Sequence, residues 1–394
     1  MTPAARIDAA IGVLDRILSG TPAEQALTGW ARASRFAGSG DRAAVRDLVF
    51  DALRRRRSLT ARAGAVEPSG RALMIGALAA SGTDPSAVFT GQGHAPSPLD
   101  ASERAALAAA PAEEALPELV ALDCPDWIAA SLRQALGADF AAILKVGRDR
   151  APVFLRVNAM RTGLDDARAM LARDGIGTDP VPDVSFTLKV TGNPQKIRNS
   201  TAYLSGLVEL QDLSPQAAVE ALPLGPGDSV LDYCAGGGGK TLALAARGAG
   251  AVVAHDALPQ RMRDLPARAA RAGAAVTIVD PAALRAKRFD LVLLDVPCSG
   301  SGTWRRTPDA KWTLTPERLA ELLRLQAAIL DAAKAHVAPG GHLAYMTCSL
   351  LTEENRAQVD AFVARNPSWR LIGDRLYTPL GGGDGFYSAL LTRA

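Results

Sequence analysis

The chain has 394 residues, of which 48% are hydrophobic and 22% are charged, and its net charge is +3. At about 150 residues per domain this length predicts two or three domains, and the composition excludes wholesale disorder and a basic tail protein. No run of about 18 apolar residues occurs, and the N-terminus lacks a basic segment before an apolar one, so we expect neither a membrane span nor an export signal. The four cysteines are too few and too scattered for a disulfide framework, which favours a cytoplasmic protein with free thiols.

The first part of the chain is predicted to be all helical. Apolar residues recur there at spacings of four, three and four, the stripe of an amphipathic helix: Ile7, Ile11, Leu14 and Leu18. Gly20 stops this segment. Residues 22–33 and 43–53 repeat the pattern, and shorter helical patches follow over 64–125.

The same region is locally basic. Residues 32–62 carry nine Arg against three Asp, a local charge of +6, and only seven of the 44 basic residues of the chain are Lys. Guanidinium groups bind phosphate in a bidentate manner, so nucleic acid is the natural partner to consider. The alternative is that Arg54–Arg57 only end a helix, where the helix dipole favours cations.

From Pro152 the pattern changes to that of a small α+β module. Val153, Leu155 and Val157 alternate with other residues before a helical segment over 165–173. Alternating strands are expected around 184–190.

From Asp228 short apolar runs alternate with helical segments. The runs are 229–233, 251–255, 276–279, 291–294 and 342–346. Strands that alternate with helices predict an α/β domain with a doubly wound parallel sheet. Ligands in such sheets bind at the carboxyl ends of the strands.

A glycine loop follows the first of these runs. Residues 232–241 read Asp-Tyr-Cys-Ala-Gly-Gly-Gly-Gly-Lys-Thr and lead directly into a helix. A phosphate-binding Walker loop needs Gly six positions before Lys240, and Cys234 stands there, so that interpretation fails. Asp256 and Asp280 end the second and third runs, where acids meet the ribose and the base of a nucleoside. The loop is therefore predicted to bind a methyl donor or a dinucleotide.

Two cysteines follow the fourth and fifth runs. Cys298 lies in Asp-Val-Pro-Cys-Ser-Gly-Ser-Gly over 295–302, and Cys348 lies in Thr-Cys-Ser, shortly before Glu353-Glu354-Asn355. Both are expected at the carboxyl end of the sheet, on the side of the glycine loop. A lone cysteine would be a small core residue by default, as we expect for Cys124. Two cysteines in polar loops of one cleft favour a role in catalysis.

These motifs resemble those of the RNA cytosine-5 methyltransferases of the Nop2/Sun family, RsmB (Sun/Fmu) type. Further matches to the family lie outside them: Arg156-Val-Asn158, Gln211-Asp212 and Asp384-Gly-Phe-Tyr387. Asp41-Arg42 and Leu53-Arg-Arg-Arg56 are similar to the NusB-like domain of that type. The chain departs from the family at Gly236-Gly237, where Ala-Pro is common, and at Val296, where Ala is common.

The resemblance implies three domains. Residues 1–125 would form a helical NusB-like RNA-binding domain, and 126–205 a small α+β, RRM-like module that positions RNA. Residues 206–394 would form a Rossmann-like class I methyltransferase domain that uses S-adenosyl-L-methionine. The implied cofactor residues are Cys234, Ala235, Gly236, Gly237, Gly238, Gly239, Lys240, Asp256, Arg261, Asp280 and Asp295.

The resemblance also implies roles in catalysis. A thiolate must add to C6 of cytosine to make C5 nucleophilic, and this role falls to Cys348, while Cys298 helps to remove the C5 proton and release the product. Asp295 would contact the cytosine edge, supported by Lys240. The candidate RNA contacts are Arg54, Arg55, Arg56, Arg156, Asn158, Arg305, Arg306 and Lys311. Trp304 or Trp312 could stack on a base.

The favoured hypothesis is therefore a monomeric methyltransferase acting on small-subunit (16S) rRNA, with tRNA or another rRNA as the alternative substrate. A second hypothesis is a non-catalytic RNA-binding factor for ribosome assembly. An amine methyltransferase would carry a loop like Asn-Pro-Pro-Tyr where Asp295-Val-Pro-Cys298 stands. No metal is expected, because the four histidines share no ligand spacing with the cysteines.

Overall fold

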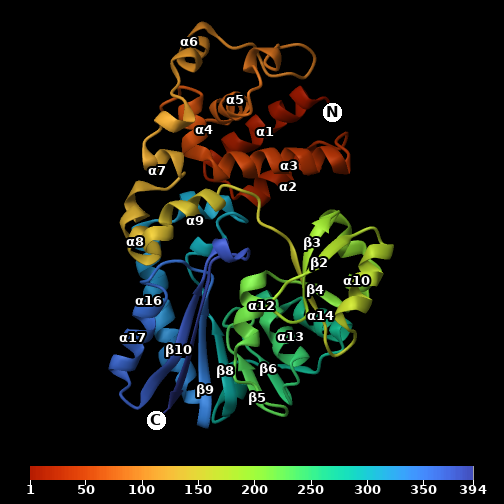
Figure 1. Cartoon of the computed structure of the whole chain (residues 1–394), viewed down its shortest axis with the longest axis vertical. Coiled ribbons are helices and arrows are strands. Elements are labelled where there is room, and N and C mark those ends of the chain that lie inside the picture. Colours follow the sequence, from red (N-terminus) through yellow and green to blue (C-terminus); the bar gives the residue numbers. More distant parts are fainter. Residues whose placement is uncertain (394) are drawn as a thin grey trace. The chain divides into compact units, whose positions relative to one another are not determined.

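The computed structural model describes residues 1–393, which form two compact units (Figure 1). The first unit contains residues 1–150 and 304–314, and the second contains 151–303 and 315–394. A short segment from the C-terminal half of the chain therefore packs among the N-terminal helices. Within the described residues no helix is both long and apolar enough to cross a membrane.

The first unit is all helical, as predicted. Its α-helices are α1 (Pro3–Leu18), α2 (Ala23–Ala33), α3 (Ser39–Arg54), α4 (Arg56–Arg62), α5 (Gly70–Ala80), α6 (Ala101–Ala109), α7 (Glu118–Ala121), α8 (Asp126–Leu136), α9 (Phe140–Val146) and α15 (Pro308–Thr313). Its 3-10 turns are Pro85–Ala87, Glu113–Ala115 and Gly137–Asp139. Helices α8 and α9 lie beyond the boundary predicted at residue 125, and they belong with this unit by their contacts.

Local sequence explains where the first helices begin and end. Thr2 caps α1 by accepting a hydrogen bond from the backbone N–H of Ala5, and the predicted apolar stripe faces the core of the unit. The run Arg54–Arg57 does not simply end a helix. Because α3 ends at Arg54 and α4 begins at Arg56, the run spans the junction of two helices.

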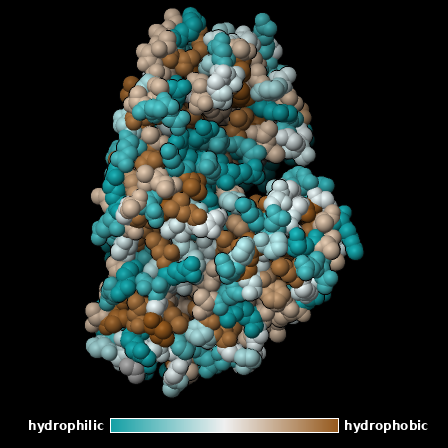
Figure 2. All heavy atoms as spheres, in the orientation of Figure 1, coloured by the Kyte–Doolittle hydropathy of each residue, from teal (hydrophilic) through white to brown (hydrophobic). Residues whose placement is uncertain are grey.

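The outer surface of α2 and α3 carries much of the basic charge. Hydrophilic residues gather over these helices in the view of Figure 2. The exposed arginines there are Arg32, Arg35, Arg42 and Arg46. These four side chains account for a large part of the local positive charge.

The second unit begins with a small antiparallel sheet in the order β2-β3-β1-β4. Its elements are β1 (Phe154–Val157), α10 (Leu164–Arg173), β2 (Gly177–Pro180), β3 (Thr187–Gly192), α11 (Thr201–Leu204) and β4 (Val208–Leu210), with a 3-10 turn at Pro194–Asn199. All of β1 is buried. Leu155 and Val157 pack in one core with α10, while Arg156 reaches the backbone of Gly239. The predicted boundary at residue 205 falls before β4, which pairs with β1.

The large sheet has seven strands in the order β10-β11-β9-β8-β5-β6-β7 (Figure 1). The strands are β5 (Ser229–Asp232), β6 (Ala251–Ala254), β7 (Val276–Ile278), β8 (Phe289–Asp295), β9 (Val337–Thr347), β10 (Trp369–Tyr377) and β11 (Phe386–Arg393). Strands β5 to β9 are the five predicted runs, and they pair in parallel. Strand β11 runs antiparallel between β9 and β10.

Helices cover both faces of this sheet. They are α12 (Leu213–Glu220), α13 (Gly239–Ala246), α14 (Leu265–Ala272), α16 (Pro316–Ala333) and α17 (Arg356–Arg365). The 3-10 turns of this part are Pro259–Met262, Ala282–Leu284, Ser301–Thr303, Lys334–His336 and Pro379–Gly381. Val292 and Leu294 pack in the core with α16 and α17, whereas Leu291 and Leu293 pack with α12 and α13. Successive residues of β8 thus serve opposite layers, and the predicted Rossmann-like arrangement is confirmed.

Candidate active site

Two thiols meet at the carboxyl end of the large sheet. Strands β8 and β9 are parallel neighbours, and Asp295 at the end of β8 pairs with Met346 near the end of β9. The loops that follow therefore start at the same level. They bring the Sγ atoms of Cys298 and Cys348 to 3.3 Å, although fifty positions separate the two residues. The sequence-based prediction that both cysteines share one site agrees with this geometry.

The two thiols have opposite ionisation tendencies. The hydrogen bond from Cys298 lowers the pKa of Cys348 against the effect of burial, and the positive charge of Lys240 acts in the same direction. Donation of that bond raises the pKa of Cys298, as do its burial and the negative charge of Glu354. Cys348 is therefore the more acidic thiol of the pair, and Cys298 is the less acidic one.

An ion pair lies beside the thiols. Lys240, in the first turn of α13, places its Nζ 2.6 Å from Oδ2 of Asp295. Burial by itself lowers the pKa of Lys240, but the charge and hydrogen bond of Asp295, with the nearby Cys348, raise it overall. The ammonium group also lies 5.0 Å from the ring centre of Phe386. Lys240 thus stays charged near the sulfur of Cys348.

Glu354 joins the two cysteine loops. This side chain is fully buried, and it accepts hydrogen bonds from the backbone N–H of Ser299 at 2.8 Å, from Ser349 Oγ at 2.5 Å and from Gln326 Nε2 at 3.0 Å. Ser299 Oγ donates to it as well. The sequence analysis noted Glu354 only as part of a motif. Its position directly after the Cys348 loop was the one signal that it supports the site.

The glycine loop makes a tight turn between β5 and α13. Gly236 and Gly238 have φ values of +50° and +80°, and a Cβ atom on Gly238 would lie 2.2 Å from the Leu265 side chain. The Asp256 carboxylate accepts hydrogen bonds from the backbone N–H groups of Gly236 and Leu258, each at 2.9 Å. Arg261 lies 3.3 Å from the same carboxylate. Asp280 is exposed after β7 and accepts a hydrogen bond from the backbone N–H of Ala283.

The surroundings of this loop suit a positively charged nucleoside ligand. Burial raises the pKa of Cys234, and the negative charges of Asp232, Asp295 and Asp256 raise it further. Two buried atoms beside the loop, Oδ1 of Asp232 and Nε2 of His255, have no hydrogen-bond partner among residues 1–393. The loop therefore combines a negative field with unused polar atoms. The sequence analysis did not include Asp232 among the cofactor residues, although it ends β5 directly before the loop.

Most of the predicted RNA contacts instead have structural roles. Arg54, Arg305 and Lys311 are buried in the first unit, where Arg54 Nε donates to the Arg305 carbonyl at 2.7 Å and Lys311 Nζ donates to the Arg54 carbonyl at 3.1 Å. Arg156 and Asn158 are buried in the second unit. All five side chains are buried, and donors of four of them, Arg54, Arg156, Asn158 and Lys311, bind carbonyl oxygens of the chain, so the prediction that these residues contact RNA phosphate is corrected.

Arg156 and Asn158 fasten the small sheet to the large one. Arg156 donates to Gln211 at 2.6 Å and to the carbonyl of Gly239 at 2.7 Å. Asn158 Nδ2 donates to the carbonyls of Gly206 and Ala272, at 3.0 and 2.8 Å. The motif that carries them therefore fixes the position of the small module beside the glycine loop.

The other candidates of the first unit lie nearer its surface. Arg55, Arg56 and Arg306 are half-buried, and Arg55 pairs with Asp51. Trp304 is buried, whereas Trp312 is half-buried and donates from Nε1 to the Leu53 carbonyl at 2.7 Å. Among residues 1–393, no group of three or more His, Cys, Asp or Glu side chains is placed to hold a metal ion.

Comparison with known proteins identifies the family. Residues 219–390 match the family described as 16S rRNA methyltransferase RsmB/F, and residues 124–195 match the ferredoxin-like domain of RsmF/B-like methyltransferases. The chain belongs to the RsmB/F methyltransferase family. This membership confirms the resemblance that the sequence motifs suggested.

Similar proteins from several bacteria carry the name ribosomal RNA small subunit methyltransferase B. The chain is 32% identical to that of Photorhabdus laumondii and 34% identical to that of Salmonella arizonae, each over 284 residues, which cover 68% of this chain and 66% of the relative. It is 33% identical to that of Vibrio cholerae over 283 residues, 68% of this chain and 65% of the relative. The chain thus matches just under two thirds of the length of these RsmB/F relatives.

Three solved structures have a similar fold. The crystal structure of PH0851 has a TM-score of 0.77 and 24% identity and covers 100% of this chain and 99% of its own. A methyltransferase homolog from Pyrococcus horikoshii has a TM-score of 0.62 and 26% identity, and the match covers 70% of this chain and 98% of the homolog. NSun6 from Pyrococcus horikoshii with SFG has a TM-score of 0.61 and 18% identity, and the match covers 68% of this chain and 98% of NSun6. The class I methyltransferase fold is therefore confirmed.

Proposed function

We propose that this protein is an S-adenosyl-L-methionine-dependent RNA cytosine-5 methyltransferase that acts on small-subunit (16S) rRNA. The thiol pair carries the proposal: Sγ of Cys298 and Sγ of Cys348 are 3.3 Å apart, beside the ion pair of Lys240 and Asp295. The rRNA substrate is taken from the names of relatives at 32–34% identity. One chain supplies all four of these side chains, so we propose that a monomer is active, in the cytoplasm.

Cys348 is the proposed nucleophile. Its thiolate adds to C6 of cytosine, the sulfur–carbon bond forms, and the electron pair of the C5–C6 double bond moves onto C5 and N3 of the ring. C5 then has the character of an enamine carbon and can accept a methyl group. The lowered pKa of Cys348 supports this role, because it raises the fraction of thiolate near neutral pH.

Cys298 is the proposed proton acceptor for the second half of the reaction. Its pKa is raised first of all by the hydrogen bond to Cys348, so it holds its proton while Cys348 is a thiolate. Once Cys348 is bonded to carbon its negative charge is gone, and this cause of the raised pKa disappears. Cys298 can then lose its proton to solvent, and the resulting thiolate takes the proton from C5. The electron pair of the C5–H bond forms the C5–C6 double bond again as the bond between Cys348 and C6 breaks, and Cys348 leaves as a thiolate.

Lys240 and Asp295 are the proposed contacts to the polar edge of the base. The Asp295 carboxylate can accept a hydrogen bond from the exocyclic amino group of cytosine, a donor that uracil lacks. The Lys240 ammonium stabilises the negative charge that spreads to N3 when the sulfur adds. Their ion pair at 2.6 Å keeps both groups ionised before the base arrives.

The residues around the glycine loop fit the proposed cofactor. S-adenosyl-L-methionine, when bound, supplies an electrophilic methyl group on a sulfonium ion. Asp256 would bind its ribose hydroxyls, and the backbone of Gly236–Gly239 permits the close approach that such a ligand needs. The negative field of Asp232, Asp256 and Asp295, which raises the pKa of Cys234, favours a cation at this position.

The test is methyl transfer to defined RNA. Small-subunit rRNA and total tRNA from a strain that lacks the gene are incubated separately with the protein and S-adenosyl-L-methionine carrying a labelled methyl group. We expect label in the rRNA alone, recovered as 5-methylcytosine after digestion to nucleosides, and none with Cys348→Ala. Label in the tRNA alone would refute the rRNA assignment. Absence of label from both would refute the enzyme assignment and favour the assembly-factor hypothesis.

A further inference from the structure

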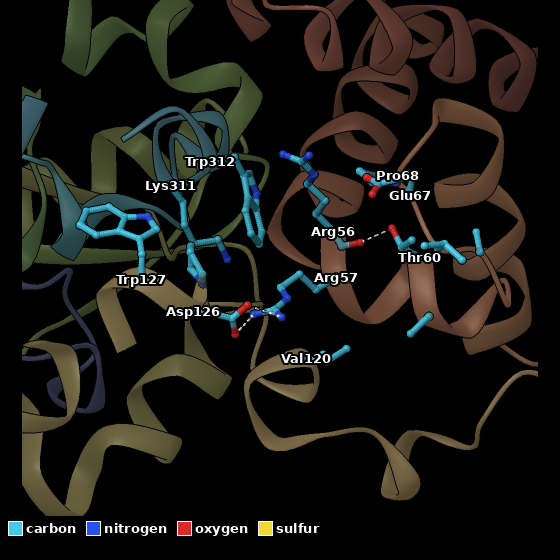
Figure 3. Close-up of a pocket in the computed structure, with 14 residues that line it drawn as sticks. Arg56, Arg57, Thr60, Glu67, Pro68, Val120, Asp126, Trp127, Lys311 and Trp312 are labelled. Carbon is cyan, nitrogen blue, oxygen red and sulfur yellow. Dashed lines mark hydrogen bonds and ion pairs between the residues drawn. The ribbon is translucent and has the colours of Figure 1, made fainter. Parts of the chain in front are cut away.

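A pocket of about 620 Å³ lies wholly within the first unit (Figure 3). Its walls come from α4, the turn after it, the start of α8 and the segment of α15. This volume is within the ~300–1,000 Å³ range of clefts that hold small ligands. None of its lining residues belongs to the proposed methyl-transfer site.

The pocket contains an arginine side chain without a polar partner. Arg56 is half-buried, and its guanidinium makes no hydrogen bond or ion pair with any of residues 1–393. Burial lowers the pKa of Arg56, and the negative charge of Glu67 opposes this effect without an ion pair between the two. Arg57 differs, because it pairs with both carboxylate oxygens of Asp126 at 2.8 and 2.9 Å. Arg56 has therefore lost part of its hydration without gaining an anion.

Two indole rings line the same pocket as this guanidinium. Arg56 lies over the ring of Trp312, 5.2 Å from its centre, and Figure 3 shows it reaching toward Trp312 from the wall formed by α4. Trp312 is held in place by its hydrogen bond to Leu53. Trp127, in the first turn of α8, leaves 40% of its surface exposed. The pocket thus offers flat aromatic surfaces next to an unpaired cation.

We propose that this pocket binds one unstacked nucleotide of the RNA substrate, an inference that rests on the proposed function. The base stacks on the exposed indole of Trp127, and an adjoining phosphate pairs with Arg56. Both interactions use features that are present before binding. The phosphate replaces the hydration that Arg56 has lost, and the base covers apolar ring surface.

An acidic peptide would fit this pocket less well. Asp126 and Glu67 line it, and they would repel further carboxylates, whereas they can accept hydrogen bonds from amino groups of a base or from a ribose hydroxyl. A peptide side chain also offers less flat surface to an indole than a nucleobase does. The charge pattern and the ring surfaces together favour a nucleotide.

The place of this pocket in the chain suits a substrate subsite. Lys311 and Trp312 belong to the segment 304–314, which begins shortly after Cys298. The backbone that carries a catalytic thiol therefore continues directly into a wall of the pocket. RNA that is held here is held by the segment that follows the catalytic loop.

The inference is tested with the full-length protein and a short unstructured RNA that carries 4-thiouridine as a photocrosslinker. We expect crosslinks on peptides that contain Trp127 or Arg56. The variants Arg56→Ala and Trp127→Ala should each raise the KM for rRNA about tenfold in methyl transfer, with kcat and the KM for S-adenosyl-L-methionine unchanged. Among residues 1–393 neither side chain makes a hydrogen bond that its variant would remove, and thermal unfolding checks that both variants fold.

Matched controls are Arg35→Ala and Phe36→Ala, which remove a cation and an aromatic ring from exposed positions of the same unit outside the pocket. Their KM for rRNA should change less than about twofold, because surface substitutions away from a binding site have small effects. An unchanged KM in both pocket variants, with crosslinks only elsewhere, would overturn the inference, as would protection of the pocket by a polyglutamate peptide but not by RNA. If the wild type crosslinks through the pocket yet methylates no RNA, the proposed function fails while the nucleotide site stands.

Discussion

The hydrogen bond between the two thiols shifts their pKa values in opposite directions, and either thiol can be removed by substitution. In Cys298→Ala the donor to the Cys348 sulfur is lost, so we expect the pKa of Cys348 to rise. Hydrogen bonds to charged groups contribute about 1.5–3 kcal/mol, which corresponds to roughly one to two pH units. Alkylation of Cys348 by iodoacetamide, followed across pH by peptide mass spectrometry, measures the shift. An identical pH profile in wild type and variant would contradict the assignment.

Asp232 gives a second prediction at the level of single residues, concerning stability. Burial, with the charges of Asp295 and Asp256, raises its pKa from 3.8 to about 7 against the effect of its hydrogen bond to Thr241. Because the folded pKa lies above the unfolded one, the protonated form stabilises the fold at low pH. That stabilisation is lost as pH rises toward 7, at up to about 1.4 kcal/mol per pH unit.

The comparison that isolates this effect is wild type against Asp232→Asn, which cannot ionise. Denaturant unfolding of both proteins at several values between pH 5 and 8 gives the difference in the free energy of unfolding. We expect the wild type to lose stability relative to the variant as pH rises to about 7, the folded-state pKa, and to level off above it. Parallel curves for the two proteins would show that Asp232 is ionised throughout.

Single residues also show what the sequence could and could not reveal. The positions of Cys298 and Cys348 were predictable, because residues that follow neighbouring parallel strands meet at one edge of the sheet. The burial of Arg54 and Lys311 was not predictable. Their partners are backbone carbonyls, and nothing in an arginine-rich stretch indicates that a carbonyl distant in sequence will accept its hydrogen bonds.

The glycine loop between β5 and α13 depends on one position more than on its neighbour. In Gly238→Ala the new Cβ meets Leu265 at 2.2 Å, and the φ of +80° disfavours any side chain. We expect a loss of about 1–3 kcal/mol in the free energy of unfolding, as for strained backbone, and weaker binding of S-adenosyl-L-methionine. Thermal unfolding with and without S-adenosyl-L-methionine measures both.

Gly237→Ala is the matched control for this variant. Its Cβ would meet only the Nη1 end of the long Arg268 side chain, at 3.1 Å, and the φ of Gly237 is not positive. The free energy of unfolding of the control should therefore be within about 0.5 kcal/mol of the wild-type value, as for substitutions away from strained positions. Equal destabilisation of both variants would mean that the loop tolerates a side chain at Gly238.

The two cysteine loops depend on Glu354, which the donors of both loops surround. In Glu354→Gln one acceptor oxygen becomes an N–H donor that faces other donors, at a cost of about 1–3 kcal/mol. We expect faster hydrogen exchange in the loops 299–303 and 349–355, with β8 unchanged. Glu353→Gln is the control, because the buried Oε2 of Glu353 has no hydrogen-bond partner among the described residues. Equal exchange in both variants would contradict the role of Glu354.

Elements with a strong local pattern were the predictable ones. The five parallel strands are short apolar runs between helices, and all five formed as expected. Strand β10 is mostly exposed and lies at the sheet edge, so its sequence has no apolar run to detect. The predicted helical segment 43–53 ends next to Arg54, the last residue of α3, but the start of α4 at Arg56 was missed, since four consecutive arginines contain no glycine or proline to mark a new helix.

At the scale of the whole molecule, the family could be predicted from the sequence more fully than the division into two units. Membership of the RsmB/F family was predictable, because short motifs around the glycine loop and the cysteines carry the resemblance. The division into units was only partly predictable. Residues 304–314 join the N-terminal helices through contacts such as that of Arg54 with Arg305. Pairings over so long a sequence separation leave no periodic pattern in a single chain.

The central claim is that Cys348 attacks the base and Cys298 completes the reaction. The most direct measurement is mass spectrometry of the protein–RNA adduct after incubation of Cys298→Ala with small-subunit rRNA and S-adenosyl-L-methionine. We expect a stable adduct that survives denaturation, with a cytosine carrying a methyl group linked to the Cys348 peptide. An adduct on any other residue, or accumulation by Cys348→Ala in place of Cys298→Ala, would contradict the account.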